Sequence, residues 1–327
     1  MTPLAERDIT IDSYLSGDDT LARDVQEGLS RPPGRRELPP KHLYDEHGSD
    51  LFDRITRLPE YYPTRCERAI LNRQAPGLVE ATDARELVEL GSGTASKTRA
   101  LLYAMAGAGA LERYVPFDVD TSVVERCADE LTDLYPGLAV HGVVGDFTRH
   151  LGHVPDGERR LVAFLGSTIG NLLPDERAGF LASVRELMGP TDRFLLGTDL
   201  LKDVAVIEAA YNDREGVTAE FNRGVLRVIN RELDADFDLG AFEHVARFDP
   251  GPSWVEMGLR ARSEQRVRIP AAGLDLTIAA GESIRTEVST KFTLDVLARE
   301  LTAAGMELEA FFTDPAGMFG LSLAAPR

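Results

Sequence analysis

Several features are scarce or missing in this chain, and each absence narrows what the protein can be. Two cysteines, Cys66 and Cys127, are too few and too isolated for a disulfide framework or a metal spacing. No apolar run approaches the roughly 20 residues that a membrane-spanning helix needs. The first residues lack the basic and apolar regions of a signal peptide. We therefore expect a cytoplasmic protein with reduced thiols and no membrane contact.

Positive charge is also in short supply. The chain has 36 lysines and arginines against 54 aspartates and glutamates, which gives a formal net charge of -18. Because an acidic surface repels phosphate backbones, nucleic acid is not an expected partner. Hydrophobic residues make up 43% of the 327 residues, enough for one elaborated domain or for two domains.

Two short segments resemble metal sites without meeting their requirements. Aspartates alternate in 234–240 as in a calcium loop, but Leu239 and Val245 stand where that loop needs glycine and glutamate. His150 and His153 lie close together, but no further cysteine or histidine completes a zinc site. We therefore expect no metal.

From about residue 85 short apolar segments alternate with helical ones. Several segments are continuous apolar runs, which is typical of a parallel sheet covered on both faces. A helix after Thr293 and two more strands continue this α/β pattern at the end of the chain. The strands are expected at residues 86–90, 114–118, 138–144, 161–165, 194–198, 308–312 and 319–323.

The pattern is different in the segment that lies between these two α/β stretches, over about residues 202–291. A helix is expected over 203–211. Apolar residues then alternate over 255–261, as in antiparallel strands with one solvent-exposed face, and alternation continues over 286–291. The N-terminal 65 residues are expected to be mainly helical, with Thr64 and Glu67 as a capping box. We predict a sheet domain and a smaller α+β domain, formed by residues 66–201 with 292–327 and by residues 1–65 with 202–291.

The segment ELGSGTASKT, from Glu89 to Thr98, is the strongest local signal. A P-loop and a dinucleotide loop both need a glycine where Ser96 stands. A methyltransferase loop instead needs an acidic residue two positions before its first glycine, as Glu89 precedes Gly91. Glycines let the backbone approach a cofactor, and a nearby carboxylate can interact with the positive amino-acid end of S-adenosylmethionine.

Carboxylates also follow the next two strands. Asp118 can bind both hydroxyls of a ribose, while Asp146 can accept from an adenine amine and Phe147 can stack on its ring. Each residue alone is more typical of a helix cap or a core position. Together they favour a cofactor site, because ligands bind at the carboxyl edge of such sheets.

Longer motifs resemble those of the histidine-specific methyltransferase family, whose best-known members open ergothioneine biosynthesis. The matching motifs are residues 41–52, 58–65, 88–94, 164–171, 287–292, 314–315 and 319–323. The resemblance covers nearly the whole chain after about residue 40. It implies a Rossmann-like S-adenosylmethionine-dependent methyltransferase sheet with a substrate-binding domain, in a monomeric enzyme. Three methyl transfers to the α-nitrogen of L-histidine would give hercynine and S-adenosylhomocysteine.

The resemblance also implies the residues of the site. Cofactor contacts would come from Gly91, Lys97, Asp118, Asp146 and Phe147. Histidine contacts would come from Tyr61, Gly166, Asn171, Tyr211, Glu287 and Ser289, with Met257 lining the pocket. The resemblance also implies that Tyr44 lies near the amine. From the chemistry of these side chains we expect two catalytic roles: Tyr44 helps the amine lose protons through water, and Asn171 anchors the amino-acid end. The glycine loop departs from the wider methyltransferase pattern at Ala95, where a third glycine is common.

Other interpretations of these residues stay open at the sequence level. Glu287 and Ser289 point to one side of a predicted strand and can bind the two imidazole nitrogens, but periodicity alone favours a solvated edge strand. Position alone likewise favours a loop residue bonded to its own backbone at Asn171, and core packing is the alternative for Met257 and for the tyrosines. The rival functions are the same fold acting on another small amine or amino acid, a non-catalytic nucleotide-binding protein and, more distantly, a nicotinamide oxidoreductase.

Overall fold

A computed structural model describes residues 8–15 and 21–327, and their contacts divide the chain into two compact units. Unit 1 contains residues 8–15, Arg65–Leu200 and Phe292–Arg327. Unit 2 contains residues 21–64 and Leu201–Lys291. Within these described ranges, no helix has the length and apolar character needed to cross a membrane.

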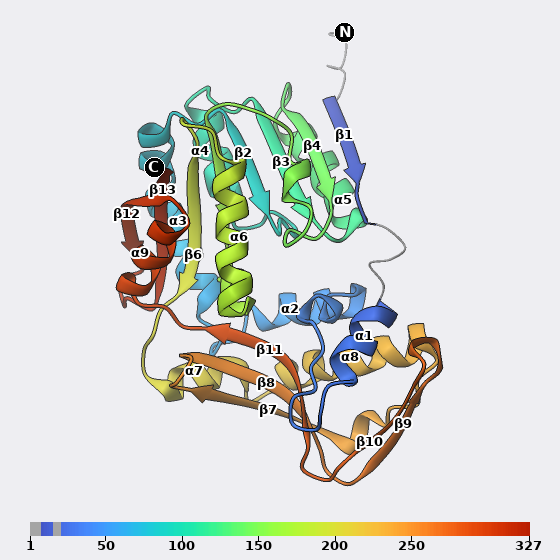
Figure 1. The fold of residues 1–327 in the computed structure, drawn as a ribbon. Coiled ribbons are helices and arrows are strands. Elements are labelled where there is room, and N and C mark those ends of the chain that lie inside the picture. Colours follow the sequence, from blue (N-terminus) through green and yellow to red (C-terminus); the bar gives the residue numbers. More distant parts are fainter. Residues whose placement is uncertain (1–7, 16–20) are drawn as a thin grey trace. The chain divides into compact units, whose positions relative to one another are not determined.

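An eight-stranded mixed sheet forms the centre of unit 1, in the order β1-β4-β3-β2-β5-β6-β13-β12 (Figure 1). The first six of these strands are parallel, and β13 and β12 close the sheet as an antiparallel hairpin beside β6. The strands are β1 (Asp8–Ser13), β2 (Glu86–Leu90), β3 (Arg113–Asp118), β4 (Ala139–Val144), β5 (Arg160–Phe164), β6 (Arg193–Asp199), β12 (Met306–Thr313) and β13 (Phe319–Pro326). The predicted parallel α/β sheet is therefore confirmed.

Helices bury both faces of this sheet. On one face α6 and α9 pack together over a core of strand residues that includes Val88, Phe164 and Phe194. Helix α5 packs on β1, β3 and β4. Thr293 caps α9, as the sequence predicts. The helices are α3 (Pro63–Thr82), α4 (Arg99–Gly107), α5 (Thr121–Leu134), α6 (Pro174–Leu187) and α9 (Leu294–Ala303).

Strand β1 departs from the prediction that the N-terminal residues are mainly helical. It pairs in parallel with β4 at one edge of the sheet, and the backbone N–H of Tyr14 continues the pairing to the carbonyl of Val144 (Figure 1). Ile9 and Ile11 alternate with polar residues, which is the pattern of a strand. Residues 8–15 consequently belong to unit 1, although they were grouped with the smaller domain. Residues 1–7 and 16–20 of that predicted domain lie outside the described residues.

Unit 2 combines helices with two antiparallel sheets. Its three-stranded sheet has the order β11-β8-β7, and β9 and β10 form a separate hairpin. The predicted strands at 255–261 and 286–291 and the helix at 203–211 are present as β8, β11 and α7. The elements are α1 (Leu21–Leu29), α2 (Glu46–Ile55), α7 (Val204–Tyr211), α8 (Val217–Leu233), β7 (Phe242–Asp249), β8 (Trp254–Ala261), β9 (Gln265–Ile269), β10 (Leu274–Ile278) and β11 (Ser283–Thr290).

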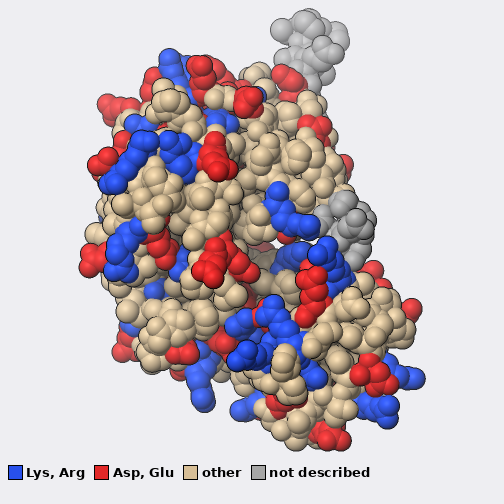
Figure 2. Space-filling model, in the orientation of Figure 1, with Lys and Arg blue, Asp and Glu red and all other residues tan. Residues whose placement is uncertain are grey.

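Helix α8 supplies much of the core of unit 2. It packs against α2 and against the three-stranded sheet, and it buries Phe221, Val225 and Ile229. On the face drawn in Figure 2, acidic and basic side chains are interspersed within each unit. The charge on this face is therefore mixed, although the whole chain is acidic.

Candidate functional site

The residues predicted for the site fall into two groups, one in each unit. The predicted cofactor residues, together with Gly166 and Asn171, belong to unit 1. The predicted ring-binding pair and the tyrosines belong to unit 2.

In unit 1 the glycine loop follows strand β2 at the carboxyl edge of the sheet. Gly91 and Gly93 have φ values of +69° and +48°, and nothing lies within 4 Å of the position where either would carry a Cβ. The backbone N–H groups of Gly91 and Ser92 donate to the carbonyl of Phe117, at 2.8 and 3.1 Å. The loop is thus tied to the neighbouring strand while its glycines border open space, which fits close approach of a ligand to the backbone.

Asp118 ends β3 directly beside this loop. One carboxylate oxygen accepts from the backbone N–H of Gly93 at 2.8 Å, and the other accepts from that of Asp120 at 3.2 Å. Burial raises the pKa of Asp118, while these backbone hydrogen bonds act against the rise. The structure therefore brings the predicted ribose ligand and the glycine loop together.

Asp146 and Phe147 follow β4, two strands away from β2. One oxygen of Asp146 accepts from the backbone N–H and the hydroxyl of Thr148, at 2.9 and 2.6 Å, and so stabilises the turn. Phe147 is half-buried and packs edge-on against Phe164 and Phe180, with ring centroids 5.1 and 5.7 Å away. Asp146 thus also has a local structural contact, and its predicted contact with adenine stays a prediction.

Lys97 is bound by a residue that the sequence predicts for another role. Glu67 in α3 is fully buried, and its carboxylate accepts from the Lys97 ammonium and from the backbone N–H of Gly166, both at 2.8 Å. The predicted capping box is therefore wrong: α3 starts at Pro63, so Thr64 lies inside the helix, and both oxygens of Glu67 are used in these contacts. A glutamate in a helix gives no local sign of such distant partners.

Glu89 likewise differs from its expected role beside the cofactor. Its side chain is buried, and its two oxygens accept from the hydroxyls of Thr98 and Tyr114, the latter at 2.5 Å. Burial raises the pKa of Glu89 to about 7, and the two hydroxyls and Lys97 limit the rise. Glu89 therefore connects β2 to β3 and to the start of α4, and both of its oxygens are engaged within the protein.

Gly166 and Asn171 bracket a tight turn after β5. Gly166 has φ +80° and Ser167 has φ +60°, and a Cβ on Gly166 would come within 2.9 Å of the Lys97 ammonium. Asn171 ends the short helix Thr168–Asn171 and is half-buried. No described residue forms a hydrogen bond with its side chain, so its donor and acceptor remain available within this part of the chain. The contacts predicted between histidine and both Gly166 and Asn171 stay predictions.

In unit 2 the predicted ring-binding pair lies on a buried face of β11. Strand β11 lies at the edge of its sheet, but Glu287 and Ser289 are only 9% and 3% exposed, so the expectation from periodicity that these polar residues are solvated is wrong. Cross-strand pairing places Met257 of β8, itself 2% exposed, opposite Glu287, after an irregularity in register between Arg285 and Glu287. Met257 thus packs in the core and also borders the predicted ring-binding carboxylate.

The carboxylate of Glu287 accepts no hydrogen bond from any described residue. Burial raises its pKa to about 7, and the positive charge of Lys291 acts in the opposite direction. A carboxylate that is only 9% exposed and accepts no hydrogen bond is costly, since the charged form has lost most of its water without gaining a hydrogen bond in return. Such a group is available to a ligand that brings a hydrogen-bond donor.

Lys291 is not among the predicted site residues, but it contacts two of them. It is 2% exposed, and its ammonium donates to the hydroxyls of Tyr211 and Ser289, both at 2.8 Å. Those two hydroxyls are 2.7 Å apart. The signal was present in the sequence, because positions 287, 289 and 291 alternate and therefore fall on one face of a continued strand.

The predicted tyrosines of unit 2 lie in one aromatic cluster. Tyr44 packs edge-on against Phe52 and Phe221, with both centroids 5.4 Å away. Tyr61 packs edge-on against Phe52 and Tyr211, at 6.2 and 6.4 Å. The cluster joins Tyr44, Tyr61 and Tyr211, and through Tyr211 it reaches Ser289.

The segments that resemble metal sites have other partners. The imidazole of His153 stacks on Tyr14 at 3.8 Å, and the Nδ1 of His150 accepts from the backbone N–H of Asp146. Asp236 accepts from the backbone and side chain of Arg268. Over residues 8–15 and 21–327, no three histidine, cysteine or acidic side chains gather as metal ligands would.

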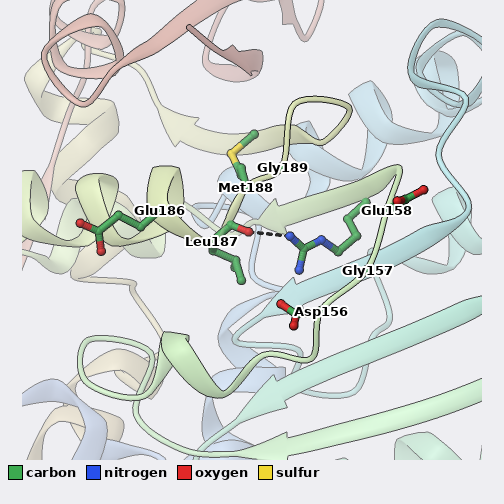
Figure 3. A pocket seen from close by; sticks show the side chains of 8 residues that line it. Asp156, Gly157, Glu158, Glu186, Leu187, Met188 and Gly189 are labelled. Carbon is green, nitrogen blue, oxygen red and sulfur yellow. Dashed lines mark hydrogen bonds between the residues drawn. The ribbon is translucent and has the colours of Figure 1, made fainter.

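A recess at the opposite edge of the unit 1 sheet contains none of the predicted site residues. It lies between the start of β5 and the end of α6, where Arg160 donates to the carbonyl of Leu187 (Figure 3). Asp156, Glu158 and Glu186 line it. Because ligands of parallel sheets bind at the carboxyl edge, this recess is not the candidate site.

Comparison with known proteins gives consistent matches over nearly the whole chain. Residues 21–326 match the model of a family described as histidine-specific methyltransferase, SAM-dependent. Histidine N-alpha-methyltransferase from Mycolicibacterium smegmatis is 52% identical, over 97% of this chain and 99% of that protein. The protein of the same name from Mycobacterium tuberculosis is 53% identical, over 93% and 94%. Ergothioneine biosynthesis protein 1 from Neurospora crassa is 30% identical, over 93% of this chain and 35% of that protein.

Proposed function

The chain belongs to the histidine-specific, SAM-dependent methyltransferase family, and from this we propose that it methylates the α-amino nitrogen of L-histidine three times, giving hercynine. This reaction would be the first step of ergothioneine biosynthesis. The same family resemblance leads us to propose a monomeric, cytoplasmic enzyme, which light scattering and cell fractionation would test.

The observation that carries the histidine proposal is the pair formed by Glu287 and Ser289. One side chain is a buried carboxylate that accepts nothing from the described residues, and the other is a buried hydroxyl on the same strand face. Residues two apart on a strand are separated by roughly 6.7 Å, which leaves room for a small ring whose nitrogens make hydrogen bonds of about 2.8 Å. An imidazole offers one donor and one acceptor nitrogen to such a pair.

For the cofactor we propose Gly91, Lys97, Asp118, Asp146 and Phe147. S-adenosylmethionine, when bound, supplies an electrophilic methyl group on a sulfonium. The positive φ values and open Cβ positions of the glycine loop fit a close approach to the backbone. Asp118, which already binds the loop through Gly93, offers carboxylate oxygens at the strand end where ribose hydroxyls bind in related sheets.

The protein's catalytic contribution would be positioning and proton removal. An amine attacks only when neutral, so the nitrogen must be held in line and must lose a proton before each transfer. We propose that Tyr44 assists this proton loss through water and that Asn171 anchors the amino-acid end. Tyr61 and Tyr211 would contribute hydroxyls, and their faces would tolerate the growing methylammonium.

Mass spectrometry of the products tests the substrate and the number of transfers. The protein is incubated with S-adenosylmethionine and an equimolar pool of amino acids. We expect histidine to gain one, two and then three methyl groups, with the trimethylated product accumulating. Methylation of another amino acid would favour the rival substrate, and no turnover despite cofactor binding in calorimetry would favour a non-catalytic protein.

A substitution tests the role of Tyr44. In Tyr44→Phe the ring still packs against Phe52 and Phe221, but its hydroxyl is lost. We expect the rate of each transfer to fall by about tenfold or more, in line with general base contributions. Unchanged rates for all three transfers would exclude Tyr44 from proton removal.

A further inference from the structure

Lys291 is a charged side chain in contact with the hydroxyls of both Tyr211 and Ser289. Its ammonium is 2.8 Å from both oxygens and lies 4.5 Å from the centroid of the Tyr211 ring. The residue is 2% exposed. Burying an ammonium is expensive unless it is bound by polar groups, so these contacts are specific and not incidental.

The donor and acceptor roles in this cluster follow from chemistry. An ammonium can only donate, so both hydroxyl oxygens act as acceptors toward Lys291. The Tyr211–Ser289 bond of 2.7 Å uses one of the two hydroxyl hydrogens. The other hydroxyl hydrogen must therefore be directed away from the ammonium. The geometry lets either hydroxyl donate in this bond. Because a phenol is more acidic than an alcohol, we take Tyr211 as the donor, and the hydrogen of Ser289 is then directed outward.

The same lysine acts on Glu287, four residues earlier and on the same face. Its positive charge lowers the pKa of Glu287 against the effect of burial, and so favours the carboxylate. A carboxylate can only accept hydrogen bonds, whereas a protonated carboxyl can also donate. With the lysine present, position 287 offers an acceptor and position 289 a donor.

We propose that Lys291 is a positioning residue that fixes this donor and acceptor order on β11, and thereby selects a neutral five-membered ring with one N–H and one bare nitrogen. The inference rests on the proposed function, because the ring is that of histidine. An imidazolium, which has two N–H groups, does not match the outward hydrogen of Ser289. A ring without nitrogen leaves both side chains without a partner, which lowers its affinity.

The chain offers a matched control in Lys202. Its ammonium donates to the hydroxyl of Tyr62 at 2.8 Å and lies 4.4 Å from the centroid of that ring, so the lysine–tyrosine contact has the same geometry. Lys202 and Tyr62 lie outside the face of Glu287 and Ser289. Loss of this ammonium should therefore leave ring selection unchanged.

The first test compares Lys291→Met with Lys202→Met. Calorimetry in the presence of S-adenosylhomocysteine measures the dissociation constants of L-histidine and of β-(2-thienyl)-L-alanine, a ring analogue without nitrogen. In Lys291→Met we expect preference for histidine to fall by about tenfold or more, the worth of one hydrogen bond to a charged group, with cofactor affinity unchanged. In Lys202→Met the preference should stay within about twofold of wild type. A folded Lys291→Met protein with wild-type preference would show that Lys291 only packs, and would overturn the proposal.

The second test uses the wild-type protein, so it holds even when Lys291→Met fails to fold. Nitrogen NMR of ring-labelled L-histidine, bound with S-adenosylhomocysteine, reports the protonation of both ring nitrogens. One protonated and one bare nitrogen is the expected result, and two protonated nitrogens would overturn the role of Lys291. Absence of histidine binding would instead contradict the proposed function, so the two failures are distinguishable.

Discussion

Glu89 in unit 1 and Glu287 in unit 2 are both buried glutamates on strands, and burial raises the pKa of each to about 7. They differ in their hydrogen bonds. Glu89 accepts from two buried hydroxyls, whereas Glu287 accepts from no described residue. A perturbed pKa alone therefore does not distinguish a structural carboxylate from one that awaits a ligand. The hydrogen bonds of the two carboxylates do distinguish them. A buried group without a hydrogen bond destabilises the protein, so it is expected only where something else, such as a ligand, offsets that cost.

The largest expected effect comes from Glu287→Gln. We expect kcat/KM for histidine to fall by about 10- to 100-fold, since a hydrogen bond to a charged group contributes roughly 1.5–3 kcal/mol. Above about pH 7, where Glu287 is charged in the folded protein, thermal stability should stay equal or rise, because the substitution removes a mostly buried charge that has no hydrogen-bond partner. Steady-state kinetics and thermal unfolding measure the two quantities. Unchanged kinetics together with lost stability would make Glu287 structural, like Glu89.

The pH dependence of stability sharpens the same comparison. The ordinary pKa of 4.5 rises to about 7 in the folded protein, so folding favours the protonated form of Glu287. The stabilisation that comes from protonating Glu287 is fully present below about pH 4.5 and is lost as pH rises through about 7. We compare the free energy of unfolding of Glu287→Gln with that of the wild type. The difference, variant minus wild type, should increase by roughly 2 kcal/mol from about pH 5 to about pH 8. A difference that stays constant over this range would mean that Glu287 does not titrate there.

The matched substitution Glu89→Gln should act on stability and not on the substrate. An amide can accept from only one of the two hydroxyls in the same way, so we expect a loss of about 1–2 kcal/mol. The KM for histidine should remain at the wild-type value. Denaturant unfolding and kinetics test this. A large rise in the histidine KM, with stability intact, would remove the distinction between the two glutamates.

The smallest effect is expected in the glycine loop next to Glu89. Ala95 has φ +52°, a left-handed conformation that costs an alanine roughly 1–2 kcal/mol. Ala95→Gly relieves this strain. It also increases the conformational entropy of the unfolded chain, which lowers stability by about 0.4–1 kcal/mol. We expect a net rise in stability of less than about 1 kcal/mol, and a loss for the reverse exchange Gly91→Ala at φ +69°. A loss in Ala95→Gly would show that its methyl group contributes more than the strain costs.

Much of the fold follows from local patterns in the sequence. Continuous apolar runs such as 161–165 predict buried parallel strands, and alternation near 255–261 predicts the antiparallel sheet. The strand β1 was missed because a short edge strand has few alternating residues to reveal it. Its place beside β4 depends on a pairing across more than a hundred residues, as in the contact between Asp12 and His141.

The sequence by itself determined the parallel sheet, the glycine loop and the carboxylates at strand ends, because these depend on the order of neighbouring residues. Tertiary structure alone decided which polar groups have partners. Glu67 is 30 residues from Lys97 and 99 from Gly166, and Tyr211 is 78 from Ser289. Burial and hydrogen bonding are properties of groups brought together by folding, so they separate Glu89 from Glu287 where residue type cannot.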